Sequence, residues 1–350
     1  MFQRKNKRVV VAISGGVDSA TSAFLLQKKG YEVIGVFMRL GTDSYNEETL
    51  ARKTCQSLGI KFYPVNLENI FHEKVIRYFL DGYSDGITPN PCVECNKLIK
   101  FGELLKVARN FNALLATGHY IRTEKKNGTY KLFRAKDKTK DQSYFLYNLK
   151  QADLKQLIFP LAALQKKDIK KLAAQRRLTH SPQESQDICF LNSGGLITDH
   201  NDYIKKHIEL VPGDIKTLDN TTVGQHAGLP LYTIGQRRGV EIGGTGPFYV
   251  VKMDYAKNTL FVTGDHNDKK LFRDEFYIEK VNWISGIEPK LPLVSNVVIR
   301  YRHKGIKCEV DKIDQFTFQV KLEKKQRAVT KGQSAVFYNN DEVIGGGIIN

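Results

Sequence analysis

The stretch that decides the fold is residues 9–30, which read Val9-Val-Val-Ala-Ile-Ser-Gly-Gly-Val-Asp-Ser-Ala-Thr-Ser-Ala-Phe-Leu-Leu-Gln-Lys-Lys-Gly30. The β-branched run at 9–13 predicts a strand. The amphipathic stretch at 19–29 predicts a helix, and Gly30 closes it just past its end. A glycine-rich turn between a strand and a helix is the start of an α/β unit.

Helices and strands alternate through the rest of the first half. This pattern predicts a parallel sheet with helices on both faces. Beyond about residue 195 the pattern changes to short alternating runs between turn residues, which is typical of small β domains. We therefore predict an α/β domain over residues 1–195, a small β-rich domain over 196–268 and a C-terminal β-barrel over 269–350. The expected helices are 47–58, 67–81 and 98–110, and the expected strands include 32–38, 62–65, 114–117, 233–239, 248–253, 259–262, 297–303, 317–322 and 335–338.

The composition is that of a globular protein with a basic surface. Apolar residues make up 41% of the 350 residues, which excludes a mainly disordered chain. No apolar run approaches the ~20 residues of a membrane helix, and the basic N-terminus is not followed by a signal-peptide core. We expect an intracellular, cytoplasmic protein with no membrane partner. Residues 97–177 hold 20 Lys or Arg against 6 Asp or Glu, which indicates a polyanionic partner such as nucleic acid.

The loop from Ser14 to Ser19 has the features of a phosphate cradle. Its two glycines let the backbone approach an anion closely, and the helix that follows offers free N–H groups. The chain contains no Gly-Lys-Ser/Thr, so this is not a Walker loop, and release of pyrophosphate with AMP transfer is favoured over γ-phosphoryl transfer. The alternative is a glycine-rich turn that binds nothing.

Three of the five cysteines stand in unusual surroundings. Cys55 and Cys308 fit core positions, whereas Cys92 and Cys95 follow a proline-rich segment at the entrance to a helix. The helix dipole and the basic run there favour thiolates. The Cys92–Cys95 spacing fits a redox pair, a metal half-site or a nucleophile with a neighbour, and two buried thiols are the alternative. Cys189 lies almost a hundred residues later and, taken alone, would be a core cysteine.

Together these motifs resemble the bacterial tRNA-specific 2-thiouridylases, the MnmA family within the PP-loop ATP pyrophosphatases. The similarity runs nearly from end to end. The segments that carry it are 14–19, 37–38, 88–101, 116–120, 140–146, 185–190, 232–239, 300–303 and 345–348.

The resemblance implies an enzyme that adenylates the C2 oxygen of the wobble uridine of certain tRNAs and replaces that oxygen with sulfur. Cys189 would carry the sulfur as a persulfide, and Cys95 would be the nucleophile that helps to release it. A persulfide is a competent attacking group at neutral pH, and AMP is a better leaving group than the unmodified oxygen. ATP is the implied cofactor, and a relay protein or a cysteine desulfurase would donate the sulfur. The implied ATP-binding residues are Ala12, Ile13, Ser14, Gly15, Gly16, Val17, Asp18, Ser19, Met38 and Gly118; the implied target-base residues are Asn90, Pro91 and Cys92; and the implied tRNA contacts are Lys140, Asp141, Gln142, Arg300 and Tyr301.

Cys92 departs from the family pattern, because many members have Asp at this position. Either Cys92 takes over the role of that carboxylate, or Cys92, Cys95 and Cys189 ligate a [4Fe–4S] cluster. Asp18 is an auxiliary candidate that could assist Mg²⁺ on pyrophosphate, with helix capping as the alternative. Rival functions are a PP-loop synthetase acting on a small metabolite and a tRNA-binding protein with an inactive nucleotide site.

Overall fold

Five parallel strands form the sheet of the first half of the chain. The computed structural model describes residues 7–41, 45–181, 188–192, 199–240, 242 and 247–350. The spatial order is β3-β2-β1-β4-β7, and each neighbouring pair is parallel. Val9, Val10 and Val11 of the central strand are fully buried, as expected for a strand covered on both faces. The strands are β1 (Arg8–Ala12), β2 (Glu32–Arg39), β3 (Lys61–Asn66), β4 (Leu114–Ala116) and β7 (Leu157–Ile158).

Helices connect these strands, and two of the connections are long composite helices. Each contains a π-helical stretch, a feature often found near functional sites. The helix predicted at 98–110 begins earlier than expected, at Pro91. The helices are α1 (Val17–Lys28), α2 (Tyr45–Ser57), the run α3 (Glu68–Phe71), η1 (His72–Ile76) and α4 (Arg77–Ser84), the run α5 (Pro91–Glu94), η2 (Cys95–Glu103) and α6 (Leu104–Asn110), then α7 (Gln151–Leu154), α8 (Lys166–Gln175) and α9 (His200–His207).

The strand order reverses beside β1, and this reversal positions the site. From β1 the chain goes to β2 on one side, and it later returns to β4 on the other side. In open parallel sheets, ligands bind in the crevice that such a reversal opens at the carboxyl ends of the strands. The glycine-rich loop after β1 and residues 117–118 after β4 both lie at this edge.

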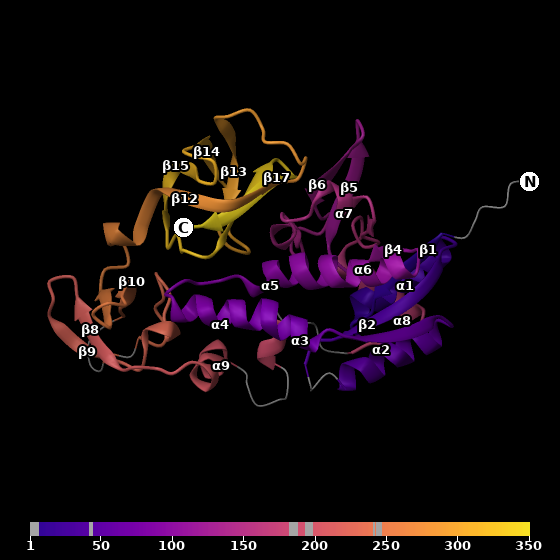
Figure 1. Cartoon of the computed structure of the whole chain (residues 1–350), viewed down its shortest axis with the longest axis horizontal. Helices are drawn as coiled ribbons and strands as arrows, with labels where there is room; N and C mark the ends of the chain where they lie inside the picture. The colour runs from indigo at the N-terminus through magenta and orange to yellow at the C-terminus, as the bar shows by residue number, and fades with distance from the viewer. Residues whose placement is uncertain (1–6, 42–44, 182–187, 193–198, 241, 243–246) are drawn as a thin grey trace, which may run out of the picture.

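A four-stranded sheet forms the middle of the chain, in the order β10-β11-β8-β9. Figure 1 labels three of its strands, β8, β9 and β10. The predicted strand at 233–239 is wrong: Gly235 and Gly239 have φ of 81° and 74°, and Gln236 donates its backbone N–H to the carbonyl of Thr233 in a turn. The strands of this sheet are β8 (Gly213–Thr217), β9 (Thr222–His226), β10 (Tyr249–Asp254) and β11 (Thr259–Thr263). Short 3₁₀ helices occur at several places along the described chain: η3 (Ser143–Phe145), η4 (Cys189–Asn192), η5 (Leu229–Leu231) and η6 (Lys269–Leu271).

The C-terminal strands close into a barrel, which Figure 1 shows above α4 and α5. Closure comes from antiparallel pairing of its first strand with its last. The predicted α/β domain followed by two small β domains, the last a barrel, is thereby confirmed. The strand predicted at 297–303 ends at Val298, because His303 donates its backbone N–H to the carbonyl of Arg300 in a turn in which Arg302 has a φ of 62°. The strands are β12 (Phe272–Trp283), β13 (Leu293–Val298), β14 (Ile306–Lys312), β15 (Phe318–Arg327), β16 (Ser334–Asn339) and β17 (Glu342–Ile349).

A hairpin from the first half of the chain joins this barrel. A turn at residues 127–128 connects β5 (Ile121–Lys126) to β6 (Thr129–Arg134), and β6 pairs with β17. Lys131 forms an ion pair of 2.8 Å with Glu342 across that pairing. The eight-stranded sheet of the barrel therefore includes two strands from the first half of the chain, separate from the parallel sheet. Among the described residues, no helix is both long enough and apolar enough to cross a membrane.

Candidate functional site

The loop between β1 and α1 is built around glycine and serine. Gly15 has a φ of 79°, and a Cβ at this residue would lie 3.1 Å from the Glu47 carbonyl, so only glycine fits here. Ser19 Oγ accepts the backbone N–H of Ser14 at 3.2 Å and donates to the carbonyl of Gly16 at 2.9 Å. These bonds hold the loop open around the first N–H groups of α1, which have no partner within the helix. This geometry is compatible with the predicted phosphate cradle.

Asp18 lies in the first turn of α1 and faces two polar groups. Gly16 is the N-cap of α1 and no side chain caps it, so the capping alternative for Asp18 is wrong. The Asp18 carboxylate instead accepts hydrogen bonds from Tyr120 Oη at 2.6 Å and from Lys166 Nζ, which lies 2.7 Å from each oxygen. Gly118, after β4, packs against the same turn: a Cβ there would lie 3.1 Å from Asp18 Cβ.

Cys92 and Cys95 lie inside the first turns of a helix rather than in the loop before it. Asn90 is the N-cap, and its Oδ1 accepts the backbone N–H of Val93 at 3.3 Å. Pro91 occupies the first helical position, where its missing N–H has no cost. This cap and proline explain why the helix starts seven residues before the predicted residue 98.

The Cys95 thiol is buried, and this changes its expected acidity. Burial raises the pKa of Cys95 to about 12; the Lys100 ammonium opposes the rise, and the nearby Cys189 adds slightly to it. The thiolate-favouring setting expected from the helix dipole is therefore outweighed by desolvation.

Cys189 is exposed, and an aromatic neighbour anchors it. The ring of Phe190 lies 6.0 Å from Phe71, 5.3 Å from Phe79 and 5.3 Å from Tyr203, measured between centroids. These contacts fix the short turn η4 against the composite helix that contains α3 and α4. Residues 185–187 of the motif that contains Cys189 lie outside the described residues.

One cavity of about 390 Å³ brings the main candidates together. It lies at the carboxyl edge of the parallel sheet, between residues 301–302 and the glycine-rich loop at 14–19, which we call the nucleotide loop. Of the predicted site residues, the lining includes Ala12, Ile13, Ser14, Gly16, Val17, Asp18, Ser19, Met38, Pro91, Cys92, Cys95, Gly118, Lys140, Gln142, Cys189 and Tyr301. The lining does not include Gly15, Asn90, Asp141 or Arg300.

Comparisons with known proteins show the family to which the chain is similar. Residues 7–193 match the family described as tRNA methyl transferase HUP domain, 201–264 match the tRNA methyl transferase PRC-barrel domain, and 273–349 match the aminomethyltransferase beta-barrel domain. The tRNA-specific 2-thiouridylase MnmA of Geobacillus thermodenitrificans is 40% identical over 98% of this chain and 94% of its own length. Its counterpart in Chloroflexus aurantiacus is 43% identical over 97% and 98%.

The chain belongs to the MnmA family of tRNA-specific 2-thiouridylases. Among solved structures, the NMN synthetase of Francisella tularensis matches 49% of this chain and 62% of its own, at 18% identity and a TM-score of 0.33.

In this thiouridylase the polar residues expected to contact tRNA have different surroundings. Tyr301 lines the cavity, with its ring 4.6 Å from Phe145 and under the guanidinium of Arg302 at 5.2 Å. Arg300 is exposed and donates to the Arg327 carbonyl at 3.2 Å. Asp141 is buried, and its carboxylate accepts from the Ala135 backbone N–H at 2.8 Å and from Ser143 Oγ at 2.7 Å. The Asp141 side chain therefore holds its own loop in place.

Several residues that line the cavity were not predicted as site residues from the sequence, and Lys100, Lys166, Arg302 and Phe190 are four of them. Lys100 and Lys166 each lie in a helix that contains other lysines, so the sequence does not single them out. Arg302 follows the predicted Tyr301, and Phe190 follows the predicted Cys189. Burial and the charge of Lys100 lower the pKa of His119 well below its usual value, so this imidazole is neutral at physiological pH. For Arg302 and Phe190, their positions next to predicted site residues were a signal in the sequence; Lys100 and Lys166 had no such signal.

The three cavity thiols do not form a ligand cage. Cys92, Cys95 and Cys189 line the same cavity, but among the described residues no three His, Cys, Asp or Glu side chains come together as a metal-binding group. Iron in a [4Fe–4S] cluster needs thiolates converging on it. The arrangement does not fit a cluster, and we derive no step through one.

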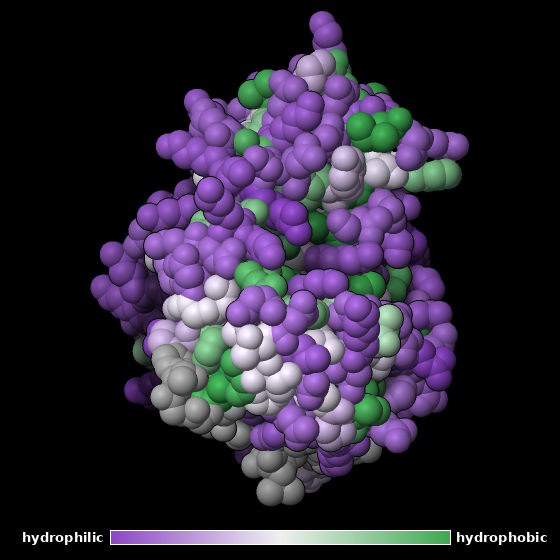
Figure 2. Space-filling model, turned by 90° about the vertical axis from the view of Figure 1, so that its left-hand side faces the viewer, coloured by the Kyte–Doolittle hydropathy of each residue, from purple (hydrophilic) through white to green (hydrophobic). Residues whose placement is uncertain are grey.

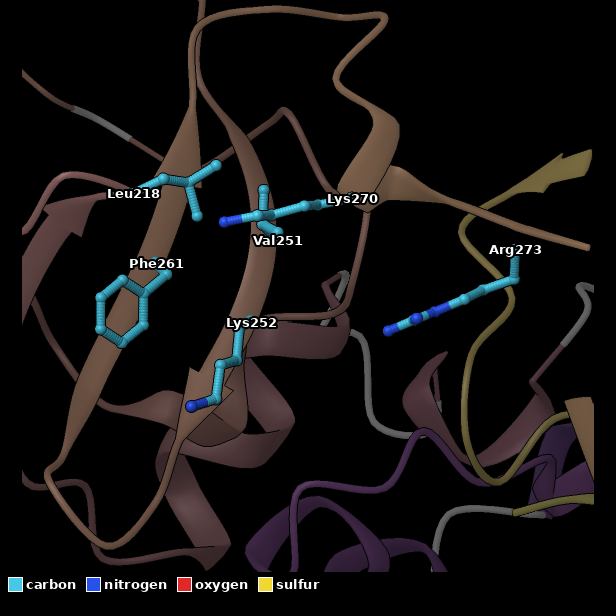
Figure 3. Close-up of a pocket in the computed structure, with 6 residues that line it drawn as sticks. All are labelled: Leu218, Val251, Lys252, Phe261, Lys270 and Arg273. Atoms are coloured by element: carbon cyan, nitrogen blue, oxygen red, sulfur yellow. The ribbon is translucent and has the colours of Figure 1, made fainter.

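A second hollow, of about 340 Å³, lies between the middle sheet and the start of the barrel (Figure 3). Lys252, Lys270 and Arg273 line it together with Leu218, Val251 and Phe261. In Figure 3 the guanidinium of Arg273 points toward the strand that carries Val251 and Lys252. This side of the molecule is mainly hydrophilic, with small separate hydrophobic patches (Figure 2). Its cationic lining suits phosphate groups.

Proposed function

We propose that this protein uses ATP to replace the C2 oxygen of the wobble uridine of tRNA with sulfur, releasing AMP and pyrophosphate. The observation that carries the proposal is the single cavity lined by the nucleotide loop, Cys95 and Cys189. A synthetase acting on a small metabolite needs the loop but not the two thiols. The same thiols favour thiolation over the methyl transfer that two of the family descriptions name.

The first step activates the uridine. Its C2 oxygen attacks the α-phosphorus of ATP, the bond between that phosphorus and the β-phosphate oxygen breaks, and pyrophosphate leaves with the electron pair. The loop around Ser14 and Ser19 and the first turn of α1 supply the N–H and O–H donors for the phosphates. Mg²⁺ would accompany the phosphates, where it would neutralise their charge.

The second step transfers sulfur. The terminal sulfur of a Cys189 persulfide attacks C2 of the activated uridine, and AMP leaves with the original oxygen. Exposure of Cys189 supports this role, because a sulfur-donor protein must reach the residue that it loads.

Cys95 would complete the turnover. Its thiolate attacks Sγ of Cys189, the sulfur–sulfur bond to the transferred atom breaks, and 2-thiouridine leaves as a Cys95–Cys189 disulfide forms. A dithiol reductant must then reopen that disulfide.

The tRNA would be held on several surfaces. Asn90, Pro91 and Cys92 are proposed to face the target base, and the tRNA contacts are proposed at Lys140, Asp141, Gln142, Arg300 and Tyr301. The buried carboxylate of Asp141 can serve only indirectly, by shaping the loop of its neighbours. Thr88, just before this segment, donates its backbone N–H to the Lys331 carbonyl at 2.9 Å, so the barrel supports the base-facing residues. We propose that the chain divides into three domains, at residues 1–195, 196–268 and 269–350, and that all three take part in binding tRNA.

The experiment compares cysteine variants in a single-turnover assay with tRNA, labelled ATP and a persulfide donor. Cys189→Ser should release pyrophosphate but yield no thiolated tRNA. Cys95→Ser should accept sulfur on Cys189 and fail to release it into tRNA. Cys308→Ser, in the barrel core, is the matched control and should thiolate normally. Full activity of Cys95→Ser, or thiolation by Cys189→Ser at the normal rate, would overturn the proposed route.

Cys92→Asp tests the departure from the family pattern. It restores the more common carboxylate and should keep most of the activity on the persulfide route. Loss of thiolation by Cys92→Asp would contradict this expectation.

A further inference from the structure

The nucleotide loop has a lysine beside it that comes from a distant part of the chain. Lys166 lies 148 residues after Asp18, and its ammonium is 2.7 Å from both Asp18 oxygens. Both side chains line the cavity with the loop. The Lys166 side chain is only 11% exposed, and its ammonium also lies 5.7 Å from the centre of the Tyr120 ring. The position is therefore built and does not result from a free surface lysine.

Helix packing fixes this lysine against the loop. Lys166 is the first residue of α8, and its backbone N–H donates to Asp137 Oδ2 at 2.9 Å. Further along α8, Ile169 and Ala173 are fully buried in one apolar cluster with Val17 and Ala20 of α1, together with the residues around them. Because α8 packs on α1 in this register, its first side chain reaches the first turn of α1.

The placement has no local explanation within α8. The N-terminal end of a helix carries a partial positive charge, so a lysine at the first helical residue is unfavourable there. Burial of the ammonium adds a desolvation cost that Asp18 offsets. An ammonium has three N–H donors, and the two bonds to Asp18 use two of them.

We propose that Lys166 binds the β- and γ-phosphates of ATP and that Asp18 and Tyr120 position it for this contact. In a Walker loop a lysine inside the motif binds these phosphates, but the present loop contains none. Here α8 supplies the cation from outside the motif. This inference rests on the proposed adenylation and specifies which residue stabilises its leaving group.

The charge balance of the step gives Lys166 its role. When the uridine oxygen attacks the α-phosphorus, the bond to the β-phosphate oxygen breaks and its electron pair stays on pyrophosphate. Negative charge grows on that oxygen, and an ammonium that is only 11% exposed stabilises it more strongly than a fully solvated one would. AMP keeps only the α-phosphate, so its binding should not depend on Lys166.

The test is isothermal titration calorimetry of the full chain, without tRNA, in a buffer that contains Mg²⁺. Lys166→Met should weaken binding of both ATP and inorganic pyrophosphate by at least roughly tenfold, as expected for the loss of a charge-assisted bond to phosphate, and should change AMP binding less than about twofold. Lys167→Met is the matched control, because Lys167 is the next residue and is exposed; it should bind all three ligands normally. Lys166→Arg keeps the charge and should retain most of the pyrophosphate binding.

The outcomes separate the two proposals. If Lys166→Met weakens AMP as much as ATP, the lysine only supports the loop, and this inference is wrong while adenylation stands. Unchanged pyrophosphate binding would also refute it. If the unaltered protein binds neither ATP nor pyrophosphate, the proposed function fails with it. Should Lys166→Met not fold, Lys166→Gln gives the same comparison, because its amide can still bond to Asp18 and carries no charge.

Discussion

Cys95 should be a slow thiol although it lies in the active cavity. Its pKa is raised from 9.0 to about 12, chiefly by burial. At pH 8 a thiol with the ordinary value is about one-tenth thiolate, whereas one with a pKa of about 12 has roughly one thiolate in ten thousand molecules. Because the thiolate is the reactive form, Cys95 should be alkylated about a thousandfold more slowly than an unperturbed thiol.

The assay follows each cysteine separately by mass spectrometry after pulses of iodoacetamide between pH 7 and 9.5. A group with a raised pKa gains thiolate throughout this window, so the rate at Cys95 should rise about tenfold per pH unit without levelling off. Cys189 is exposed and serves as the fast reference, and Cys55, whose pKa burial also raises to about 12, serves as the buried reference. In denaturant all three rates should converge.

A further variant tests the cause of the shift. Lys100→Met removes the ammonium that lowers the pKa of Cys95, so alkylation at fixed pH should slow further. Lys106→Met, an exposed lysine on the same composite helix, should have no such effect. If Cys95 is alkylated at pH 8 as fast as Cys189, or its rate levels off below pH 9, the thiol is not desolvated and the reasoning is refuted.

Four further outcomes are expected. Gly118→Ala places a Cβ 3.1 Å from Asp18 and should destabilise the fold by about 1–3 kcal/mol in urea melts, with weaker ATP binding. Phe190→Ala removes the aromatic contacts that hold the turn carrying Cys189. In the single-turnover assay, thiolation of tRNA should therefore fall while pyrophosphate release continues. The dissociation constant for tRNA should rise at least roughly tenfold between 50 and 200 mM salt in filter binding, because the basic stretch 97–177 displaces counterions. Cys308→Ser should cost about 1 kcal/mol in thermal or urea melts and leave thiolation unchanged.

The local elements of the nucleotide site could be predicted from the sequence, because their signals lie within a few residues. The β-branched run, the two glycines and the amphipathic stretch after them define the strand, loop and helix that the structure contains. The later β domains were predictable from their alternating runs for the same reason.

Errors arose where turn geometry or a cap overrides a local pattern. Residues 233–239 alternate as a strand does, but the positive φ of Gly235 and Gly239 bends them into turns. Asn90 and Pro91 start a helix before any helical periodicity is visible. These decisions depend on one or two residues, whereas periodicity is judged over a longer window.

Contacts between distant segments could not be predicted at all. Nothing near Lys166 distinguishes it from Lys167, and only the packing of α8 on α1 brings one of the two to Asp18. The pairing of β6 with β17 is similar, because it joins strands about two hundred residues apart in the sequence.

The pKa of the Cys95 thiol also depends on packing between distant segments, and on the proposed route it has a functional consequence. On the proposed route a Cys95 thiolate beside a loaded Cys189 persulfide would attack Sγ of Cys189 and expel hydrosulfide, which would waste the sulfur and leave a disulfide. On that route, burial that raises the pKa of Cys95 would keep the thiol protonated and slow this reaction while the persulfide waits for tRNA, and release would require Cys95 to lose its proton. The exposed Cys189 remains open to the sulfur donor. On this proposed route the difference in burial between two cysteines 94 residues apart would separate loading from release. The sequence around each cysteine predicts the reverse, a thiolate at Cys95 and a core position for Cys189, whereas Cys95 is buried and Cys189 is exposed.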